Sequence, residues 1–377
     1  MSAPGSPQIE SPSVTAIIVS YRSAALSIEA LRSLERERQL GGVAIRAIVI
    51  DNASGDLPFL QQAVASNDWS SWVQALAAPR NGGFGYGNNL GIELACAQGV
   101  PSYFYLLNPD TQVRAGAVRA LIDFLQSHPQ AGIAGSSFEH ADGTEWSIAF
   151  RFPGLISEVC DGVQLGPLTR LLERWCVPIR MGKSPRRVDW ICGASMMIRP
   201  EVLGVIGGFD ERYFLYFEET DFCLRARRAG YSTWYVPDSR VMHIRGQSTG
   251  VTALQASPPR LPAYWFESRR TYFATALGHS RALLVDGAAL LSHGVGRLKD
   301  APLRSRRENR TPYYIRDLWR QSRWRRGNRQ SEAPRTSPER FRQLISSAAS
   351  RTKAGLEFEE SDIHNNMSYA DTARGRP

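Results

Sequence analysis

Four apolar runs of strand length divide the first third of the chain. They contain many β-branched residues without strict apolar–polar alternation, and they occupy residues 14–21, 43–51, 72–79 and 103–110. This pattern is typical of strands that are buried on both faces of a parallel sheet. Apolar residues at helical spacing follow three of the runs, at Ser27–Leu40, Leu90–Ala97 and Ala117–Leu125. The alternation predicts an α/β domain with a mixed, mostly parallel sheet flanked by helices.

The pattern changes in the second half of the chain. Residues 189–203 predict a strand that runs directly into a helix. A further helix is expected over Asp221–Ala229, because Gly230 is a residue type that commonly ends helices. A strand over Ser232–Val236 and a turn at Pro237-Asp238 are expected next.

The composition changes at both ends of this region. Residues 1–13 are rich in Ser and Pro and predict a disordered N-terminal tail. The α/β domain is expected over 14–278, a basic helical extension over 279–329, and a polar, poorly ordered tail over 330–377. The chain has 377 residues, of which 43% are hydrophobic, so it can build a sizeable core.

The net charge of +9 indicates an anionic partner, such as a phospholipid surface, a phosphate-bearing substrate or a nucleic acid. Residues 297–329 hold twelve Lys or Arg against three Asp or Glu, with four aromatic residues among them. This segment suits attachment to an anionic membrane surface, and an ordinary solvated helical face is the equally weighted alternative. A nucleic acid is not expected, because no RNA- or DNA-binding signature is present.

The cysteines and the lengths of the apolar runs indicate the cellular compartment in which the protein is expected. The five cysteines are scattered without a CxxC pair, which argues against a disulfide framework or a zinc site and favours a reducing cytosol. No signal peptide is expected, and no run reaches the roughly 18–20 apolar residues that span a bilayer. The protein is therefore expected in the cytoplasm, with peripheral contact to the inner face of the cell membrane as a further option.

Polar residues follow three of the predicted strands, at the carboxyl ends where open α/β sheets bind ligands. Asp51 can accept hydrogen bonds from a ribose or a base edge, and its alternative role is a helix N-cap. The glycine-rich segment 81–89 brings backbone close to a ligand or forms a tight loop before a helix. Asp110 could hold Mg²⁺ or Mn²⁺ together with a diphosphate, or it could cap a helix.

The acidic cluster Glu218-Glu219-Thr220-Asp221 is the expected source of a general base. Adjacent carboxylates raise one another's proton affinity, which suits acid–base chemistry near neutral pH. The alternative is an acidic first helical turn that the helix dipole favours. His243 follows a predicted strand and could be a ligand of the same cation, provided that the fold brings it near Asp110.

Seven motifs occur in an order that resembles family 2 glycosyltransferases with the GT-A fold. The resemblance is greatest to the rhamnosyltransferase-like branch, which builds bacterial cell-wall and surface polysaccharides. It covers residues 14–278, and the ordered set is specific although each motif alone is modest. The motifs are VTAIIVSYRS, IVIDNAS, RNGGFGYGNN, LLNPDT, DWICGASMMIRP, GGFDERYFLYFEETDFCLRARRAGY and HIRGQST.

The resemblance implies a donor site in the first four motifs and an acceptor site in the fifth. The donor residues would be Ser20 and Tyr21 in the nucleotide pocket, Asp51 at the base or ribose, and Asn81, Gly82, Asn88, Asn108 and Asp110 along the donor. The acceptor residues would be Trp190, Cys192 and Gly193, where the acceptor meets the donor sugar.

Two departures from the family pattern concern the metal and the base. Asp110 stands at the second acid of the family's metal-binding Asp-x-Asp, and Asn108 replaces the first, so a metal would depend on the diphosphate and His243. Glu219 stands where the family commonly has the Asp of a Glu-Asp pair, with Glu218 and Asp221 as neighbouring candidates. The implied mechanism is a single inverting displacement in which Glu219 deprotonates the acceptor hydroxyl.

Family analogy also suggests the substrates. The donor would be a nucleotide-diphosphate sugar, first dTDP-L-rhamnose, with UDP- and GDP-sugars as alternatives. The acceptor would be a glycan or a glycan on a polyprenyl-diphosphate carrier. The two departures leave one alternative function, that of a catalytically inactive member that binds sugar nucleotides or serves as a scaffold subunit.

Overall fold

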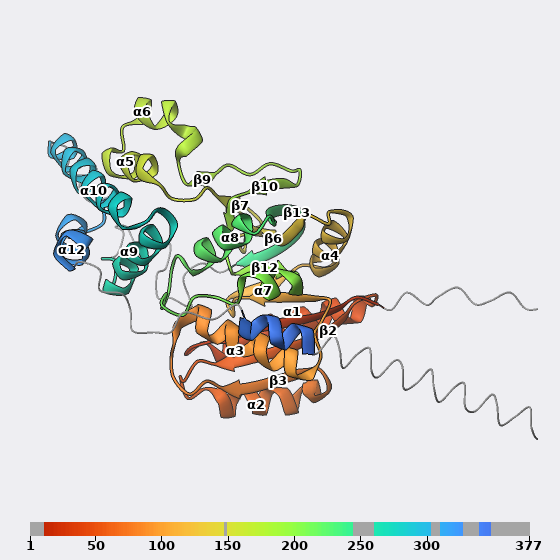
Figure 1. Ribbon diagram of the computed structural model, residues 1–377. Coiled ribbons are helices and arrows are strands. Elements are labelled where there is room, and N and C mark those ends of the chain that lie inside the picture. Colours follow the sequence, from red (N-terminus) through yellow and green to blue (C-terminus); the bar gives the residue numbers. More distant parts are fainter. Residues whose placement is uncertain (1–10, 147–148, 244–259, 303–309, 327–338, 348–377) are drawn as a thin grey trace, which may run out of the picture.

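A mixed β-sheet lies at the centre of the computed structural model, which describes residues 11–146, 149–243, 260–302, 310–326 and 339–347 (Figure 1). Within these residues ten strands build the sheet in the order β10-β13-β6-β12-β4-β1-β2-β3, with β5 paired to β13 and β7 to β6. The strands are β1 (Ser13–Ser20), β2 (Ala44–Asp51), β3 (Val73–Ala77), β4 (Tyr103–Leu107), β5 (Thr111–Val113), β6 (Ala131–Glu139), β7 (Glu145–Trp146), β10 (Arg186–Val188), β12 (Ser195–Ile198) and β13 (Ser232–His243). A second, small sheet contains β8 (Ala149–Phe150), β9 (Pro178–Ile179) and β11 (Trp190–Ile191).

The main sheet confirms the predicted α/β class. Strand β1 pairs in parallel with β2 and β4, β2 with β3, and β6 with β13, whereas β12 runs antiparallel between β4 and β6. The register of β1 on β2 runs from Ser13 opposite Ala44 to Ser20 opposite Asp51. Ser20 and Asp51 therefore end side by side at the carboxyl edge of the sheet, where ligands of such sheets bind.

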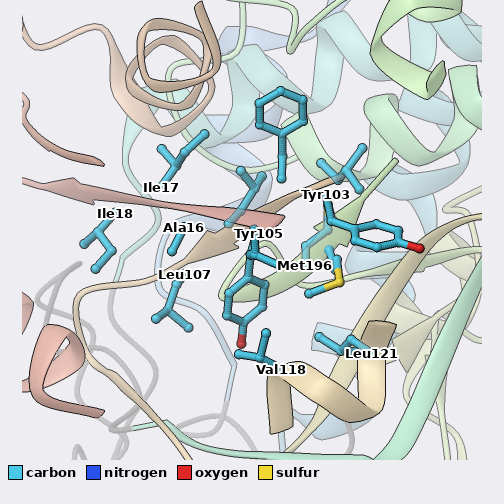
Figure 2. Close-up of a cluster of buried hydrophobic side chains, with 14 of the residues drawn as sticks. Ala16, Ile17, Ile18, Tyr103, Tyr105, Leu107, Val118, Leu121 and Met196 are labelled. Atoms are coloured by element: carbon cyan, nitrogen blue, oxygen red, sulfur yellow. The ribbon is translucent and has the colours of Figure 1, made fainter. Parts of the chain in front are cut away.

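Helices flank the sheet, and the core between them is apolar. Figure 2 shows side chains from β1, β4, β12 and α4 meeting in this core. The Tyr105 hydroxyl lies within it and is 2.8 Å from the Ser195 hydroxyl, which satisfies a polar group that would be costly to bury alone. The flanking helices are α1 (Ala24–Leu40), α2 (Leu57–Ser66), α3 (Gly83–Gln98), α4 (Ala117–Ser127), α7 (Pro200–Ile206) and α8 (Glu218–Arg228), with short 3₁₀ turns at Trp69–Ser71 and Glu173–Trp175.

The start of α3 corrects the sequence prediction. The helix was expected from Leu90 with a glycine loop before it, but it begins at Gly83 and includes most of the glycine-rich segment. The reason is packing against β1. A Cβ atom on Gly87 would lie 2.6 Å from Val19, and one on Gly91 would lie 2.5 Å from the Ile17 side chain. Glycine is therefore used here to bring a helix onto a strand, despite its low helix propensity.

Strand β13 corrects a second prediction. A turn was expected at Pro237-Asp238, but the strand continues from Ser232 to His243, and its pairing with β6 shifts register between Val236 and Arg240. Such an irregularity accommodates a proline, which has no N–H for the ladder. The strand thereby carries His243 to the site described below. Helix α2 and strand β6 were not predicted, and the residues after His243 in the motif HIRGQST lie outside the described part of the chain.

A layer of helices lies beside the sheet, at the upper left of Figure 1. We call α5, α9, α10, α12 and α13 the helical layer. The predicted helical extension is confirmed by α10, α12 and α13. Helix α10 packs on α5 and α9, α12 packs on α9 and α10, and α13 packs on α10 and α12. The layer consists of α5 (Leu155–Val163), α9 (Ala263–Leu277), α10 (His279–Asp300), α12 (Tyr314–Gln321) and α13 (Arg323–Arg326), and the short α6 (Gly166–Leu171) follows α5.

A buried ion triad joins three helices of this layer. Arg269 of α9 is 1% exposed and donates to Glu158 of α5 at 2.7 Å and to Asp286 of α10 at 2.6 Å. Asp286 also accepts from the backbone N–H of Arg323, at the start of α13. Buried charges of this kind are tolerated only when they are paired and hydrogen-bonded. The triad therefore ties α9, α10 and α13 to α5, which comes from the middle of the chain.

Residues 339–347 form a helix within the tail that was predicted to be poorly ordered. Phe341 is fully buried in the main core, and Arg340 forms an ion pair of 2.6 Å with Glu93 of α3. The segment docks on the main core because it carries apolar residues. The polar composition of the tail as a whole obscured them in the sequence. In the described part of the chain, no helix is both long and apolar enough to cross a membrane.

Candidate active site

A cavity of about 700 Å³ lies between the small sheet, the start of α8 and the helical layer. One wall comes from the end of β13, the start of α8 and the residues around β11, with Trp190, Cys192, Glu219 and His243. The other wall comes from the helical layer and from Arg310, which precedes α12, and it includes residues that were not site candidates in the sequence. These are Glu158, Asp161, Trp265, His293, Arg297, Arg310 and Tyr314.

Glu219 is held at the cavity wall by the start of α8. Its Oε1 accepts a hydrogen bond from the backbone N–H of Gly193 at 3.4 Å. Gly193 has no room for a side chain, because a Cβ there would lie 2.6 Å from the Phe84 ring and 3.1 Å from Cγ of Glu219. Burial raises the pKa of Glu219 above that of an ordinary glutamate. A carboxylate with raised proton affinity on a cavity wall can accept a proton from a bound hydroxyl group.

The two neighbouring acids lie differently. Glu218 is 2% exposed and does not line the cavity, and burial together with the nearby Glu219 charge raises its pKa well above the ordinary value. Asp221 forms an ion pair of 2.7 Å with Arg225, whose guanidinium also donates to two backbone carbonyls. The geometry of Asp221 is that of a structural residue, whereas Glu219 alone of the three faces the cavity.

Helix α8 begins from a strained backbone. Tyr216 and Phe217 have φ values of 70° and 68°, a left-handed region that residues with side chains adopt rarely. The preceding loop is fixed by Asn89 of α3, whose amide group donates to the Phe209 carbonyl at 2.9 Å and accepts from the Phe209 N–H at 2.8 Å. Strain of this kind is retained where the surroundings hold it, and it commonly occurs at functional sites. Asn89, Tyr216 and Phe217 were missed in the sequence, although Asn89 lies in the glycine-rich motif.

Gly83 supports the same loop, and its replacement by alanine is expected to destabilise the protein. Gly83 has φ +87°, and a Cβ there would lie 1.6 Å from the Phe214 carbonyl oxygen. Gly55 has the same φ of +87°, but a Cβ there would meet nothing within 4 Å. Gly55→Ala therefore carries only the backbone strain, whereas Gly83→Ala adds a steric clash worth about 1–3 kcal/mol more. Chemical denaturation of both variants measures the difference, and equal stabilities would contradict the close approach.

Asp110 and His243 meet at the end of the sheet, as the sequence hypothesis required. His243 Nε2 lies 3.3 Å from Asp110 Oδ1, because β5 pairs antiparallel with β13 and places Thr111 opposite His243. Both side chains are largely buried, and His243 also lines the cavity. Asn108 lies close by and is held through its backbone, with its N–H bonded to the Ala194 carbonyl.

The predicted nucleotide residues gather at the carboxyl edge of β1 and β2. Ser20 is fully buried and 3.2 Å from the Ser23 hydroxyl, whereas Tyr21 is 37% exposed. Asp51 is 1% exposed, and its carboxylate accepts hydrogen bonds from the Ser54 hydroxyl and the backbone N–H groups of Ser54, Gly55 and Leu57. Asp51 is not the N-cap residue of α2, which is Asp56, and its carboxylate instead holds the loop that leads into that helix.

The predicted donor-flanking residues lie at the start of α3. Asn81 accepts from the Gly83 N–H and from the Asn52 side chain, and Gly82 is the N-cap residue of the helix. Asn88 is 1% exposed and donates to the Phe84 carbonyl at 3.0 Å. Asn81 and Gly82 therefore shape the helix start, Asn81 contacts Asn52, and none of the three residues lines the cavity.

The predicted acceptor residues do line the cavity or support its wall. Trp190 stacks on Phe150 with ring centroids 4.2 Å apart, and its Nε1 donates to the Arg151 carbonyl. Burial, with the Glu219 charge nearby, raises the pKa of the Cys192 thiol to about 12, so the thiol stays neutral and unreactive. All five cysteines are free.

The wall from the helical layer is aromatic and polar. His293 stacks on Tyr314 at 4.1 Å, and burial together with Arg310, Arg269 and Arg297 lowers the pKa of His293 to about 4. Its imidazole is therefore neutral at physiological pH and offers one donor and one acceptor. Burial raises the pKa of Asp161 to about 6, with a further contribution from Glu158. Stacked rings beside hydrogen-bonding side chains suit a carbohydrate.

The mostly parallel sheet with polar residues at its carboxyl edge, flanked by helices, is a fold of the GT-A type. The chain belongs to the glycosyltransferase-like family 2, because residues 12–257 match the model of that family. The fold is shared with the crystal structure of GalNAc-T7 with UDP, GalNAc and Mn²⁺, at a TM-score of 0.50 and 12% identity. That alignment covers 82% of this chain and 57% of the other.

The chain is also similar to proteins that are named as rhamnosyltransferases. It is 34% identical over 188 residues to the N-acetylglucosaminyl-diphospho-decaprenol L-rhamnosyltransferase of Mycobacterium tuberculosis. That alignment covers 47% of this chain and 61% of the relative. It is 22% identical to the dTDP-rhamnosyl transferase RfbF of Shigella flexneri, over 63% of this chain and 70% of that protein. The match thus spans about three fifths of the M. tuberculosis relative.

Proposed function

We propose that this protein is an inverting glycosyltransferase that transfers L-rhamnose from dTDP-L-rhamnose to a hydroxyl of a lipid-linked glycan during surface polysaccharide synthesis. One observation carries the proposal. A single cavity is lined by Glu219, a candidate base, and by His243, which contacts Asp110 at the sheet edge expected to hold the donor diphosphate. The names of the relatives support rhamnose as the sugar and a polyprenyl-diphosphate glycan as the acceptor.

The proposed reaction is a single displacement. The acceptor oxygen forms a bond to the anomeric carbon while the bond from that carbon to the diphosphate oxygen breaks, and the nucleoside diphosphate leaves. Glu219 takes the acceptor proton on a carboxylate oxygen, and the Gly193 N–H holds the carboxyl group in place. The raised pKa of Glu219 strengthens it as a base, provided that the pH is high enough to keep it ionised.

Asp110 and His243 fit a divalent cation in their chemistry. A carboxylate and an imidazole in contact, beside a site for diphosphate oxygens, are ligands that Mg²⁺ or Mn²⁺ accepts. The described residues contain no cluster of three or more His, Cys, Asp or Glu that could hold a metal alone. The cation would therefore share its coordination with the donor, and it would supply neutralisation of the negative charge on the leaving diphosphate.

The cavity suits a glycan acceptor in size and lining. Its volume of about 700 Å³ exceeds that of one sugar ring, so part of a longer acceptor fits. Trp190 offers an aromatic face near Glu219, and His293 and Tyr314 offer a second stacked pair on the opposite wall. An acceptor sugar between these walls would present a hydroxyl group to Glu219.

Donor binding tests the proposal directly. Calorimetry with dTDP-L-rhamnose, UDP-sugars and GDP-sugars, with and without Mn²⁺ or Mg²⁺, is expected to show metal-dependent binding of dTDP-L-rhamnose. Asp110→Ala is expected to weaken that binding at least about tenfold by removing a cation ligand. Asp68→Asn, at an exposed position, is the control and should bind like the wild type. Binding of none of the donors under any metal condition would favour an inactive scaffold.

A further inference from the structure

Helix α10 is apolar on two opposite faces. Its inner face carries Ala282, Val285 and Ala289, each at most 1% exposed, and packs on the rest of the helical layer. Its outer face carries a second row of apolar residues, which we call the outer stripe. The outer stripe consists of Leu284 (66% exposed), Ala288, Leu291 (71%), Val295 (46%) and Leu298 (77%).

The spacing of the outer stripe places its members on one line. Steps of four and three residues keep side chains on the same side of a helix, and the stripe extends over about 21 Å at 1.5 Å per residue. Beside it, a Cβ on Gly287 or Gly294 would meet nothing within 4 Å, so the surface next to the leucines is open. A solvated helix normally presents polar residues outward, and a continuous apolar row there indicates a partner.

The exposed charged side chains of α10, α12 and α13 all have one sign. In residues 279–302 and 310–326 the three acids, Asp286, Asp300 and Asp317, are all buried, and each forms an ion pair with an arginine. The exposed charged side chains of these two segments are all arginines. They are Arg281, Arg297, Arg316, Arg320, Arg325 and Arg326. A partner of this surface is therefore expected to be anionic.

Two exposed tryptophans adjoin α10. Trp324 is 59% exposed, and its Nε1 donates to the Leu283 carbonyl of α10 at 3.2 Å, which fixes the ring beside the helix. Trp319, on the neighbouring α12, is 46% exposed. Tryptophan prefers the boundary between water and hydrocarbon, because its ring is apolar and its N–H is polar.

We infer that the outer stripe of α10 docks on the surface of an anionic lipid bilayer, with α10 lying along the membrane plane. The leucines and Val295 would enter the headgroup–acyl boundary, and the tryptophans and arginines would lie at headgroup level. A second copy of this chain fits the surface less well, since pairing two such faces would bring only positive charges together. Figure 1 shows α10 at the outer edge of the molecule, and the cavity residues His293 and Arg297 belong to the same helix.

Vesicle co-sedimentation of the full-length protein tests this inference. The protein is expected to bind vesicles of phosphatidylcholine with phosphatidylglycerol, and to bind pure phosphatidylcholine vesicles more weakly. The triple variant Leu284→Ser, Leu291→Ser, Leu298→Ser should lower the partition coefficient on the anionic vesicles roughly tenfold or more. The matched control, Leu40→Ser with Phe59→Ser and Val205→Ser, removes exposed apolar side chains elsewhere and should bind like the wild type.

Three outcomes of these measurements would overturn the inference. Unchanged vesicle binding by the triple variant would do so, and so would an equal loss in the control variant. A dimer in light scattering that the triple variant converts to a monomer, with vesicle binding retained, would assign the stripe to self-association. Circular dichroism of each variant checks that the fold is kept. The assay measures binding to lipid alone, so its result is independent of the proposed glycosyl transfer.

Discussion

Glu219→Gln is expected to lower kcat for glycosyl transfer by about 10²–10⁴, while the dissociation constant of the donor stays within about threefold. Glutamine keeps the size of the side chain and can still accept a hydrogen bond from the Gly193 N–H, but it cannot take the acceptor proton. Single-turnover transfer and calorimetric donor binding measure the two quantities separately. Near-normal turnover would eliminate Glu219 as the base.

Glu218→Gln distinguishes the neighbouring acids. Glu218 does not line the cavity, so this variant should keep kcat within about tenfold of the wild type. A larger loss than that of Glu219→Gln would transfer the assignment to Glu218.

The pH dependence of transfer gives an independent readout of the same base. Glu219 acts when deprotonated, so the rate should rise with pH through its pKa and then level off. Burial raises that pKa above the ordinary 4.5, and the acidic limb should shift upward accordingly. Loss of this limb in Glu219→Gln, with the limb retained in Glu218→Gln, is the expected pattern.

Arg269→Ala is expected to lower the free energy of unfolding by about 3–5 kcal/mol. The substitution leaves the carboxylates of Glu158 and Asp286 buried without their shared cation, and both are anchors of the helical layer. Because that layer forms one wall of the cavity, acceptor binding should weaken together with stability. Denaturant titration measures the first effect, and the KM for the acceptor measures the second.

An exposed ion pair provides the control for this prediction. Arg119 and Asp123 lie 2.7 Å apart on α4, and each side chain is about half exposed. Arg119→Ala should change the free energy of unfolding by less than about 1 kcal/mol, because solvent screens the pair. Similar losses in the two variants would show that burial of the triad contributes nothing to the stability of the layer.

The sequence determined the first four strands of the sheet, the family and the candidate base. The apolar runs at 14–21, 43–51, 72–79 and 103–110 correspond to β1 to β4. Strands β1 and β4 are buried along almost their whole length, as such runs predict, whereas β3 is an edge strand with exposed positions. The polar residues that end these strands were found from the same pattern. The acidic motif predicted a general base, the family resemblance pointed to Glu219 within it, and the structure brings Glu219 to the cavity wall.

Only the tertiary structure decided how distant segments meet. Asp110 and His243 are far apart in the chain, and the pairing of β5 with β13 puts them in contact. The early start of α3 depends on glycine packing against β1, which no local propensity reveals. The sequence left Asp51 as a ligand-binding residue or a helix N-cap, whereas the structure shows its carboxylate accepting four hydrogen bonds from its own loop and Asp56 as the N-cap residue of α2.

The second wall of the cavity was also beyond the sequence. A basic helical extension could be predicted from composition, but its ion triad with α5 and its contribution to the cavity could not. The physical reason is that hydrophobic periodicity shows which face of each helix or strand can be buried, and motif order shows only the sequence of these segments along the chain. Long-range pairing and packing depend on which surfaces are complementary in three dimensions, and those contacts placed Glu219, His243 and the helical layer around one cavity.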